Sequence, residues 1–459
     1  MSSYDLMLRN GIVVTADAEL QADVGVVGDM ITTVAPRLAG DARQTIDADG
    51  CYILPGFVDP HVHLSLPNGQ GLTSSDDFES GTIAAACGGT TTIIDFTTQR
   101  RGISLSQAVA ERRAQADGRA VIDYALHLTV TDANPQTLAD LRTLAQHGYP
   151  SLKLYMTYES VMVRDDDILR ILDVAADCGV LALVHAEHHD IVTYLQHKLI
   201  ADGHRDPGAH ALSRPTWVEA EAVGRAIALA RATGAPLYIV HVSCAEAVGH
   251  IRRARGDGQA VYAETCPHYL LLSDEEYSRP GFEAAKYVMT PPLRPSGNQS
   301  ALWDALTDGT LDVVATDHCP WMYATQKIVG RDDFRRIPGG IAGVETRGVL
   351  LYSEGVVKRQ LSLRRLVALL STNPARLFGL YPRKGTIAAG SDADIVIFDS
   401  RRSWTISNRL LHQHVDYTVF EGWPVVGYPL LTVSRGQIVA RDGQFVGRRG
   451  HGQFIARQR

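Results

Sequence analysis

The sequence predicts an α/β protein, namely a (β/α)8 TIM barrel with a smaller β-sandwich domain built from both ends of the chain. The chain has 459 residues, more than the roughly 250–300 residues that one hydrophobic core usually supports. Its middle alternates apolar, strand-like runs with amphipathic, helix-like stretches, whereas its two ends resemble strands joined by tight turns. We therefore expect residues 1–54 to form the first part of the sandwich, 55–383 the barrel, and 384–459 the second part with a C-terminal tail.

The ends of the chain carry short apolar segments and turn signals typical of antiparallel strands. The turn signals are Asn10-Gly11, Gly28-Asp29 and Asp442-Gly443, dipeptides that favour tight hairpins. The segments predicted as strands are Leu6–Val14, Asp23–Val34, Ala393–Phe398 and Gln437–Phe445.

The middle of the chain contains eight apolar runs separated by helical patterns. This alternation favours a closed barrel over an open sheet. No glycine-rich phosphate loop follows any of the runs, so a nucleotide-binding fold has no support. The runs are Gly56–His63, Thr91–Thr97, Val121–Thr131, Ser151–Thr157, Val180–Glu187, Pro236–Ser243, Gln259–Cys266 and Leu311–His318. The helical stretches between them include Leu105–Ala116, Pro135–His147, Asp166–Cys178, Val218–Thr233 and Ala245–Arg255.

Charge and composition restrict the class of protein. The formal net charge of -7 argues against nucleic acid or an anionic membrane as the main partner. The six cysteines are scattered and form no CxxC pair, so neither a disulfide framework nor a zinc finger is expected. The N-terminus lacks the pattern of a signal peptide, and no apolar stretch is long enough to span a membrane. We therefore expect a cytoplasmic protein.

Residues able to bind metal recur at the ends of the predicted strands. In a barrel enzyme the chemistry lies at the C-terminal ends of the strands, so these residues are expected to converge in space. Taken singly, each has another explanation: a histidine pair at a strand end can be satisfied by hydrogen bonds, and an aspartate can cap a turn. Together they predict a metal site formed by His61, His63, Lys153, His185, His241 and Asp317.

Lys153 is the unusual member of this set, because it lies inside the apolar strand Ser151–Thr157. A buried, unpaired ammonium is costly, although a lysine can also extend its charged end to solvent. A neutral amine that reacts with CO2 becomes a carbamate with two oxygens and one negative charge. Such a group can bridge two cations, which predicts a binuclear site.

Several motifs make the chain resemble the hydantoinase/dihydropyrimidinase branch of the amidohydrolase superfamily. The resemblance covers nearly the whole chain, and the Ser-Asp-Asp-Phe stretch at 75–78 favours this branch over its relatives. The motifs are Gly56–His63, Thr73–Thr82, the strand of Lys153, Glu264–Tyr269, Thr290–Arg294, Thr316–Pro320, Asp416-Tyr417 and Phe420–Trp423.

The resemblance implies a role for each predicted site residue. His61, His63 and Asp317 would bind the first metal, His185 and His241 the second, and a carboxylated Lys153 would bridge both. Two divalent metal ions are implied, with zinc expected first and manganese or cobalt also suited to these ligands. Asp317 would transfer the proton to the departing nitrogen. Tyr158 would stabilise the oxyanion and contact the substrate together with Thr290 and Gly339.

Four places in the chain depart from the usual family pattern. Thr290 replaces a serine, and Gly339 replaces the asparagine of an Ile-Pro-Asn-Gly motif, which could widen the substrate pocket. Cys266–Tyr269 is more like allantoinases and dihydroorotases than many hydantoinases. His188 and His189 replace the usual Asn-Gly, and we expect both to face solvent.

The implied function is hydrolysis of a small-molecule cyclic amide, with hydantoin or dihydropyrimidine rings opened to N-carbamoyl amino acids. Allantoinase is the alternative, since its ring is also a hydantoin. Dihydroorotase is disfavoured because no arginine follows His61–His63 closely. Non-catalytic, dihydropyrimidinase-like interaction proteins resemble the fold but lack the metal ligands, whereas this chain has all six. The family is commonly tetrameric, so we expect a homotetramer in which 401–459 could mediate assembly.

Overall fold

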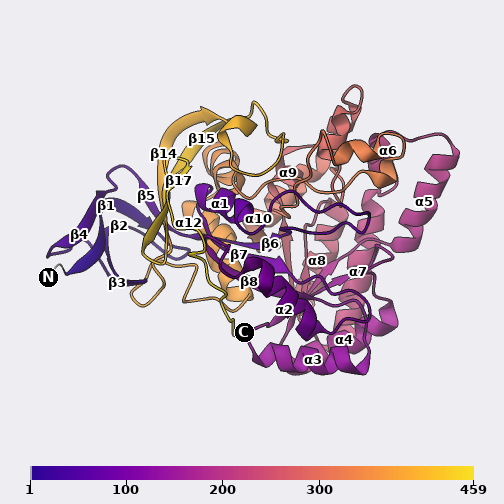
Figure 1. Cartoon of the computed structure of the whole chain (residues 1–459), viewed down its shortest axis with the longest axis horizontal. Coiled ribbons are helices and arrows are strands. Elements are labelled where there is room, and N and C mark those ends of the chain that lie inside the picture. Colours follow the sequence, from indigo (N-terminus) through magenta and orange to yellow (C-terminus); the bar gives the residue numbers. More distant parts are fainter. Residues whose placement is uncertain (1–2) are drawn as a thin grey trace.

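A computed structural model describes residues 3–459 and contains two separate sheets. The larger is an eight-stranded parallel sheet in which the strands follow one another in sequence order, from β6 to β13 (Figure 1). Each of the eight strands overlaps one of the eight predicted apolar runs. They are β6 (Phe57–Val62), β7 (Thr90–Phe96), β8 (Asp123–Thr129), β9 (Ser151–Tyr155), β10 (Leu181–His185), β11 (Leu237–Ile239), β12 (Val261–Thr265) and β13 (Val313–Val314).

This sheet curls until its first and last edges meet. Val62 at the end of β6 pairs in parallel with His318, just beyond β13. The backbone N–H of His63 donates to the carbonyl of His318 at 2.8 Å. The prediction of a (β/α)8 barrel is thereby confirmed.

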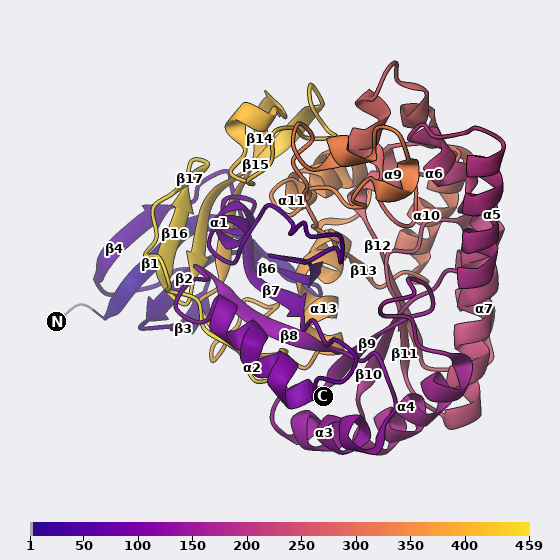
Figure 2. The same cartoon turned by 45° about the vertical axis from the view of Figure 1, so that its right-hand side comes forward.

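Helices cover the outside of the barrel, and in Figure 2 α2, α3, α4 and α7 follow one another around it. The predicted helix Leu105–Ala116 coincides with α2 at both ends, and the four other predicted helices match α3, α4, α7 and α8 within a few residues. The helices are α1 (Ser80–Cys87), α2 (Leu105–Ala116), α3 (Pro135–Gln146), α4 (Asp165–Cys178), α5 (His189–Ala201), α6 (Gly208–Leu212), α7 (Thr216–Thr233), α8 (Ala245–Gly256), α9 (Pro267–Leu271), α10 (Gly297–Asp308), α11 (Arg347–Leu350), α12 (Leu363–Val367) and α13 (Asn373–Leu377).

Helix α4 illustrates why these segments are helical. Three aspartates, 165–167, occupy its first turn, where negative charge interacts favourably with the helix dipole. Ile168, Ile171 and Leu172 are buried at the three- and four-residue spacing of one helix face. Gly179 ends the helix in a left-handed conformation with φ of 65°, which glycine adopts without steric cost.

The second sheet has nine strands and takes them from both ends of the chain, as predicted. In Figure 1 it lies to one side of the barrel, with the N-terminal strands outermost. Its own apolar core is separate from the barrel core. Its strands are β1 (Tyr4–Val14), β2 (Glu19–Val27), β3 (Met30–Ala35), β4 (Ala42–Asp47), β5 (Tyr52–Pro55), β14 (Ile395–Thr405), β15 (Pro424–Ser434), β16 (Gln437–Arg441) and β17 (Gln444–Phe445).

Two of the three predicted turns are confirmed and one is wrong. Gly28-Asp29 joins β2 to β3, and Asp442-Gly443 joins β16 to β17. Asn10-Gly11 instead lies inside β1, where the register shifts between Leu8 and Gly11 and Asn10 has a φ of 64°. This dipeptide therefore forms a bulge, which needs the same left-handed backbone as a turn. The boundaries proposed at 54/55 and 383/384 stay predictions.

The helices range in length from four residues in α11 to 18 residues in α7. Within residues 3–459, none combines the length and the apolar character needed to cross a lipid bilayer.

Candidate metal centre

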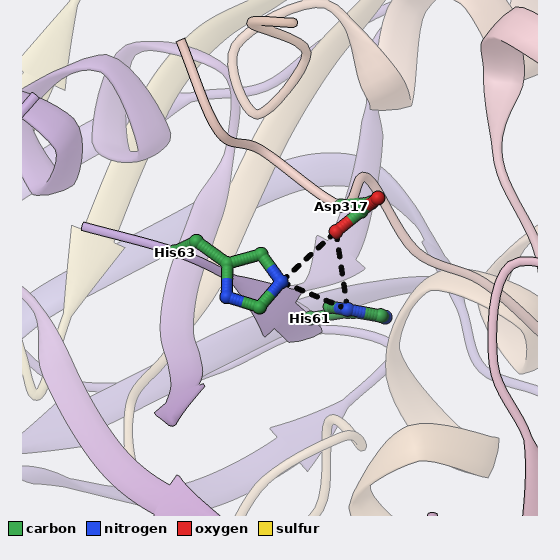
Figure 3. A group of neighbouring side chains, drawn as sticks. All are labelled: His61, His63 and Asp317. Carbon is green, nitrogen blue, oxygen red and sulfur yellow. Dashed lines mark hydrogen bonds and ion pairs between the residues drawn. The ribbon is translucent and has the colours of Figure 1, made fainter. Parts of the chain in front are cut away.

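Three predicted ligands from the two closing edges of the barrel meet at one point. His61 lies on β6, His63 directly follows this strand, and Asp317 follows β13. One carboxylate oxygen of Asp317 lies 3.1 Å from His61 Nε2 and 3.0 Å from His63 Nε2, and the two imidazole nitrogens are 3.2 Å apart. Figure 3 shows the three polar groups pointing toward a common centre. The side chains of both histidines are almost fully buried.

A second pair of ligands lies beside the first group. His185 ends β10, and His241 follows β11. His185 Nδ1 and His241 Nε2 are 2.9 Å apart, and the ring centroids of His61 and His241 are separated by 5.5 Å. The convergence expected at the strand ends is therefore observed for all four histidines.

Lys153 is buried in the same region, with 1% of its surface exposed. Its Nζ atom lies 5.3 Å from the ring centroid of Phe96 and 5.0 Å from that of Tyr155. Within the described part of the chain it has neither a hydrogen bond nor an ion pair. Burial lowers its pKa to about 8, although Asp317 and Glu264 act in the opposite direction. The amine is thus substantially neutral at mildly alkaline pH.

The donor set fits divalent metal ions. Imidazole nitrogens and a carboxylate suit zinc, manganese and cobalt, and the nitrogen and oxygen atoms of His61, His63 and Asp317 approach closely enough to share one ion. A second cluster of possible ligands is formed by Cys87, Glu345 and His412, but two of its members already have a partner. There the carboxylate and the imidazole already bond to each other at 2.8 Å, so they satisfy each other without an ion.

Two buried carboxylates support the histidines, and sequence reasoning assigned no role to either. Glu264, at the end of β12, accepts a hydrogen bond from His61 Nδ1 and one of 2.8 Å from the Tyr238 hydroxyl. Glu187 lies 2.7 Å from His185 Nε2. Both lie near the C-terminal ends of predicted strands. The expectation that these strand ends converge at the site could therefore have identified them. Such partners fix the ring orientation of metal-binding histidines.

The backbone is strained at three of the predicted site residues. Their φ angles are 69° for Tyr158, 41° for His241 and 51° for Asp317. This left-handed region is uncommon for residues other than glycine. Such conformations cluster at functional sites, where the surrounding structure enforces them.

The three predicted substrate-binding residues lie together beside the histidines. The ring of Tyr158 is 5.3 Å from that of His185, centroid to centroid. Burial raises the pKa of Tyr158, while Arg214 and the Thr290 hydroxyl act against this rise, so its hydroxyl stays a hydrogen-bond donor. A Cβ atom on Gly339 would lie 3.2 Å from Thr290 Oγ1.

His188 and His189, which were expected to face solvent, are only partly exposed. His188 precedes α5, and its Nδ1 atom is buried without a partner among residues 3–459. The expectation was wrong because the chain turns into α5 directly after the strand-end residue Glu187, so both histidines pack at the start of that helix.

Comparison with known proteins places the chain in a family. The model of the Amidohydrolase family matches residues 52–439. The D-hydantoinase of Geobacillus stearothermophilus is 46% identical over 98% of this chain and 96% of its own length. The crystal structure of dihydropyrimidinase from Brevibacillus agri superposes with a TM-score of 0.97 at 47% identity, covering 100% of this chain and 99% of the other. The L-hydantoinase (dihydropyrimidinase) of Arthrobacter aurescens gives a TM-score of 0.90 at 32% identity, covering 99% and 100%. The chain therefore belongs to the amidohydrolase family, among relatives that include hydantoinases and dihydropyrimidinases.

Proposed function

We propose that this protein is a binuclear metal-dependent hydrolase that opens hydantoin or dihydropyrimidine rings to N-carbamoyl amino acids. The convergence of four buried histidines, Asp317 and the buried Lys153 carries this proposal. The names of relatives that share 42–46% identity over nearly the whole chain support the choice of substrate. A non-catalytic role is disfavoured because all six predicted ligands are present.

Each ligand has a proposed place. His61, His63 and Asp317 hold one cation, and His185 and His241 hold the other. Carboxylation of Lys153 gives a group that bridges both, and its neutral amine near pH 8 is the form that reacts with CO2. We propose zinc as the resident metal, with manganese and cobalt as the ions that the same ligands accept.

The two cations supply Lewis acidity, which polarises a ring carbonyl and lowers the pKa of water. The remaining steps belong to side chains. Asp317 accepts a proton from the water that attacks the ring carbonyl and delivers it to the nitrogen that departs as the ring C–N bond breaks. The Tyr158 hydroxyl donates a hydrogen bond to the oxygen on which negative charge develops. Burial keeps this hydroxyl protonated, because it raises its pKa.

Thr290 and Gly339 are proposed to contact the ring of the substrate. Gly339 is exposed, and the absence of a side chain beside Thr290 leaves room for a substituent. We propose D-selective turnover, since the relatives named D-hydantoinase share 43–46% identity with the chain, whereas the L-hydantoinase shares 32%. Assembly into a homotetramer through 401–459 is a further prediction from the resemblance, and a cytoplasmic location stays a prediction from the sequence pattern.

The proposal is tested by supplying metal-loaded protein with four substrates side by side: dihydrouracil, hydantoin, a bulky 5-substituted hydantoin and allantoin. Preferential turnover of the first three is expected, and their ranking measures the pocket. Turnover of allantoin alone would support the proposed metal chemistry but refute the proposed substrates, because the protein would then act as an allantoinase. Absence of turnover with two metals bound would refute hydrolysis of these rings.

A variant connects this activity to the centre. Lys153→Ala should lose both hydrolysis and about one metal equivalent, because it removes the proposed bridge. Lys198→Ala is the matched control, since Lys198 pairs with Asp202 on the exposed surface of α5. Unchanged metal content in Lys153→Ala would exclude a bridging role.

A further inference from the structure

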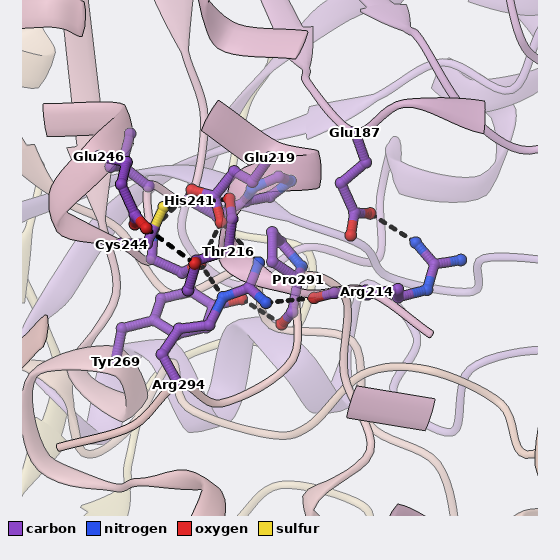
Figure 4. Close-up of polar contacts among 12 residues, drawn as sticks. Glu187, Arg214, Thr216, Glu219, His241, Cys244, Glu246, Tyr269, Pro291 and Arg294 are labelled. Carbon is purple, nitrogen blue, oxygen red and sulfur yellow. Dashed lines mark hydrogen bonds and ion pairs between the residues drawn. The ribbon is translucent and has the colours of Figure 1, made fainter. Parts of the chain in front are cut away.

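A buried ion pair lies behind the second histidine pair. Arg214, just before α7, donates from Nη1 to Glu187 Oε2 at 2.6 Å, and Figure 4 shows the two side chains facing each other. The same carboxylate oxygen lies 2.7 Å from His185 Nε2. Both side chains are at least 95% buried, with exposed fractions of 5% and 0%.

This arrangement decides which nitrogen of His185 carries its proton. Glu187 Oε2 accepts a hydrogen bond from the guanidinium of Arg214, whose nitrogens can only donate. The same oxygen also accepts from the ring of His185, so the proton of the imidazole lies on Nε2. Nδ1 is left with its lone pair directed toward His241 Nε2, 2.9 Å away. Arg214 thus sets the orientation of His185 through Glu187.

Arg214 also contacts the other side of the site. Its guanidinium carbon lies 5.5 Å from the ring centroid of Tyr158, within the range of a cation–π contact. Its backbone carbonyl accepts a hydrogen bond from Arg294. Arg294 in turn bonds to Glu219 at 2.7 Å and to the Ser243 hydroxyl at 2.8 Å, and Ser243 lies two residues beyond His241. The backbone at 214 is therefore fixed to the segment that follows β11.

The pair is not explained by stability alone. Arg214 Nε and Glu187 Oε1 are buried and have no hydrogen-bond partner among residues 3–459. Burying charged groups with unsatisfied atoms is costly, and a buried ion pair is often no more stabilising than apolar residues of the same size. A role in the geometry of the site accounts for this cost.

We propose that Arg214 is a positioning residue shared by the two halves of the active site. Through Glu187 it fixes the ring of His185 for metal binding, and through the contact of its guanidinium with the ring it positions Tyr158. The His185 half rests on the proposed binuclear metal centre, and the Tyr158 half rests also on the proposed hydrolysis. Lysine cannot replace arginine here, because its ammonium lacks the planar face that stacks on a ring while its edge donates.

The first experiment measures metal affinity rather than activity. Arg214→Lys and Glu187→Gln are titrated with cobalt(II), and the visible spectrum and chelator competition report each site. Loss of a partner to a ligating histidine typically weakens metal binding about 10–100-fold, so the second equivalent should weaken by this factor while the first is retained. Arg435→Lys is the control, because Arg435 forms a buried pair with Asp123 at 3.1 Å at the other end of the barrel.

The second experiment tests the contact with Tyr158 by a double-mutant cycle on kcat. If Arg214 positions the Tyr158 hydroxyl, Arg214→Lys should cost less in a Tyr158→Phe background than in the wild type. Additive losses would overturn the Tyr158 half. Equal second-metal affinity in Arg214→Lys, Glu187→Gln and Arg435→Lys would overturn the His185 half. If the wild type hydrolyses no cyclic amide, the metal titration still decides the His185 half on its own.

Discussion

Substitution of Glu264 by glutamine tests how far the charge of this carboxylate, which bonds to His61, controls metal binding. Glu264 is fully buried and accepts hydrogen bonds from His61 Nδ1 and from the Tyr238 hydroxyl at 2.8 Å. Glutamine keeps the shape and one acceptor, so the change removes mainly the charge. A hydrogen bond to a charged group contributes about 1–2 kcal/mol more than a neutral one, which corresponds to about 5–30-fold in affinity.

The pH dependence of this loss has a defined sign. Burial lowers the pKa of His61, but Glu264 and Asp317 together raise it to about 9. Below that pH, an incoming metal must displace a proton from His61. In Glu264→Gln the pKa of His61 falls, so this competition is weaker at neutral pH and offsets part of the lost affinity. The loss should therefore be largest near and above pH 9, and it should shrink toward pH 7.

Metal affinity measured by chelator competition at about pH 7 and pH 9 checks both the magnitude and the sign. Glu345→Gln is a matched control, since Glu345 is also buried and pairs with an imidazole, that of His412, at 2.8 Å. A loss of less than about twofold at pH 9, or one that grows as the pH falls, would refute the reasoning.

Three further substitutions test separate parts of the molecule. Asp317→Asn should retain part of the bound metal but lose about 10²–10⁴-fold in kcat, because an amide cannot accept the proton. The test measures kcat and metal content in the same samples, and a near-normal kcat would contradict proton transfer by Asp317. Gly339→Asn places a side chain against Thr290 Oγ1, 3.2 Å from the added Cβ. It should lower kcat/KM about tenfold more for a bulky 5-substituted hydantoin than for hydantoin, and equal losses would remove Gly339 from the pocket. His412→Gln tests the half-buried pair that His412 forms with Glu345. A hydrogen bond to Glu345 raises the pKa of His412 in the folded protein. The pair therefore stabilises the fold below the unfolded pKa of about 6.5, and this stabilisation is lost as the pH rises through the folded pKa. The decrease in Tm should be greater at pH 6 than at pH 9, and the reverse order would exclude this linkage.

The barrel could be predicted because each of its parts is locally consistent. The strands are short apolar runs, and helices such as α2 begin at a capping serine, Ser104, whose side chain accepts from the backbone of Gln107. Strand β15 was missed for the opposite reason. It contains Pro424, Gly427 and Pro429, which normally interrupt strands. The structure accommodates them through register shifts against β14, which depend on the partner strand and leave no signal in the sequence of β15 itself.

The residues of the candidate site also divide into those that the sequence predicts and those that it does not. Five of the six proposed ligands follow from one rule, that the C-terminal ends of barrel strands meet, and the rule needs no knowledge of the loops. Lys153 is identified differently, as a lysine inside the apolar strand β9. The rule also reaches Glu187 and Glu264, whose strands end beside the histidines. Arg214 lies outside the reach of this rule, because it precedes α7 after a long excursion from β10 through α5 and α6. The position of such a residue depends on how that excursion packs.

The left-handed backbone at Tyr158, His241 and Asp317 is the least predictable feature and the one that most directly links fold to chemistry. Aspartate and histidine adopt such a φ more often than most residues, but the residue type alone does not specify it, and the conformation costs of order 1–3 kcal/mol per residue. Each residue lies just beyond a strand, where the chain must leave the barrel while the side chain still turns inward. The parallel pairing of the strands before them fixes the entry, and contacts such as the hydrogen bond from the His241 backbone to Glu264 at 3.3 Å hold the turn. The barrel therefore supplies the energy that keeps these side chains at the centre, and a loop of the same sequence without its strands would not.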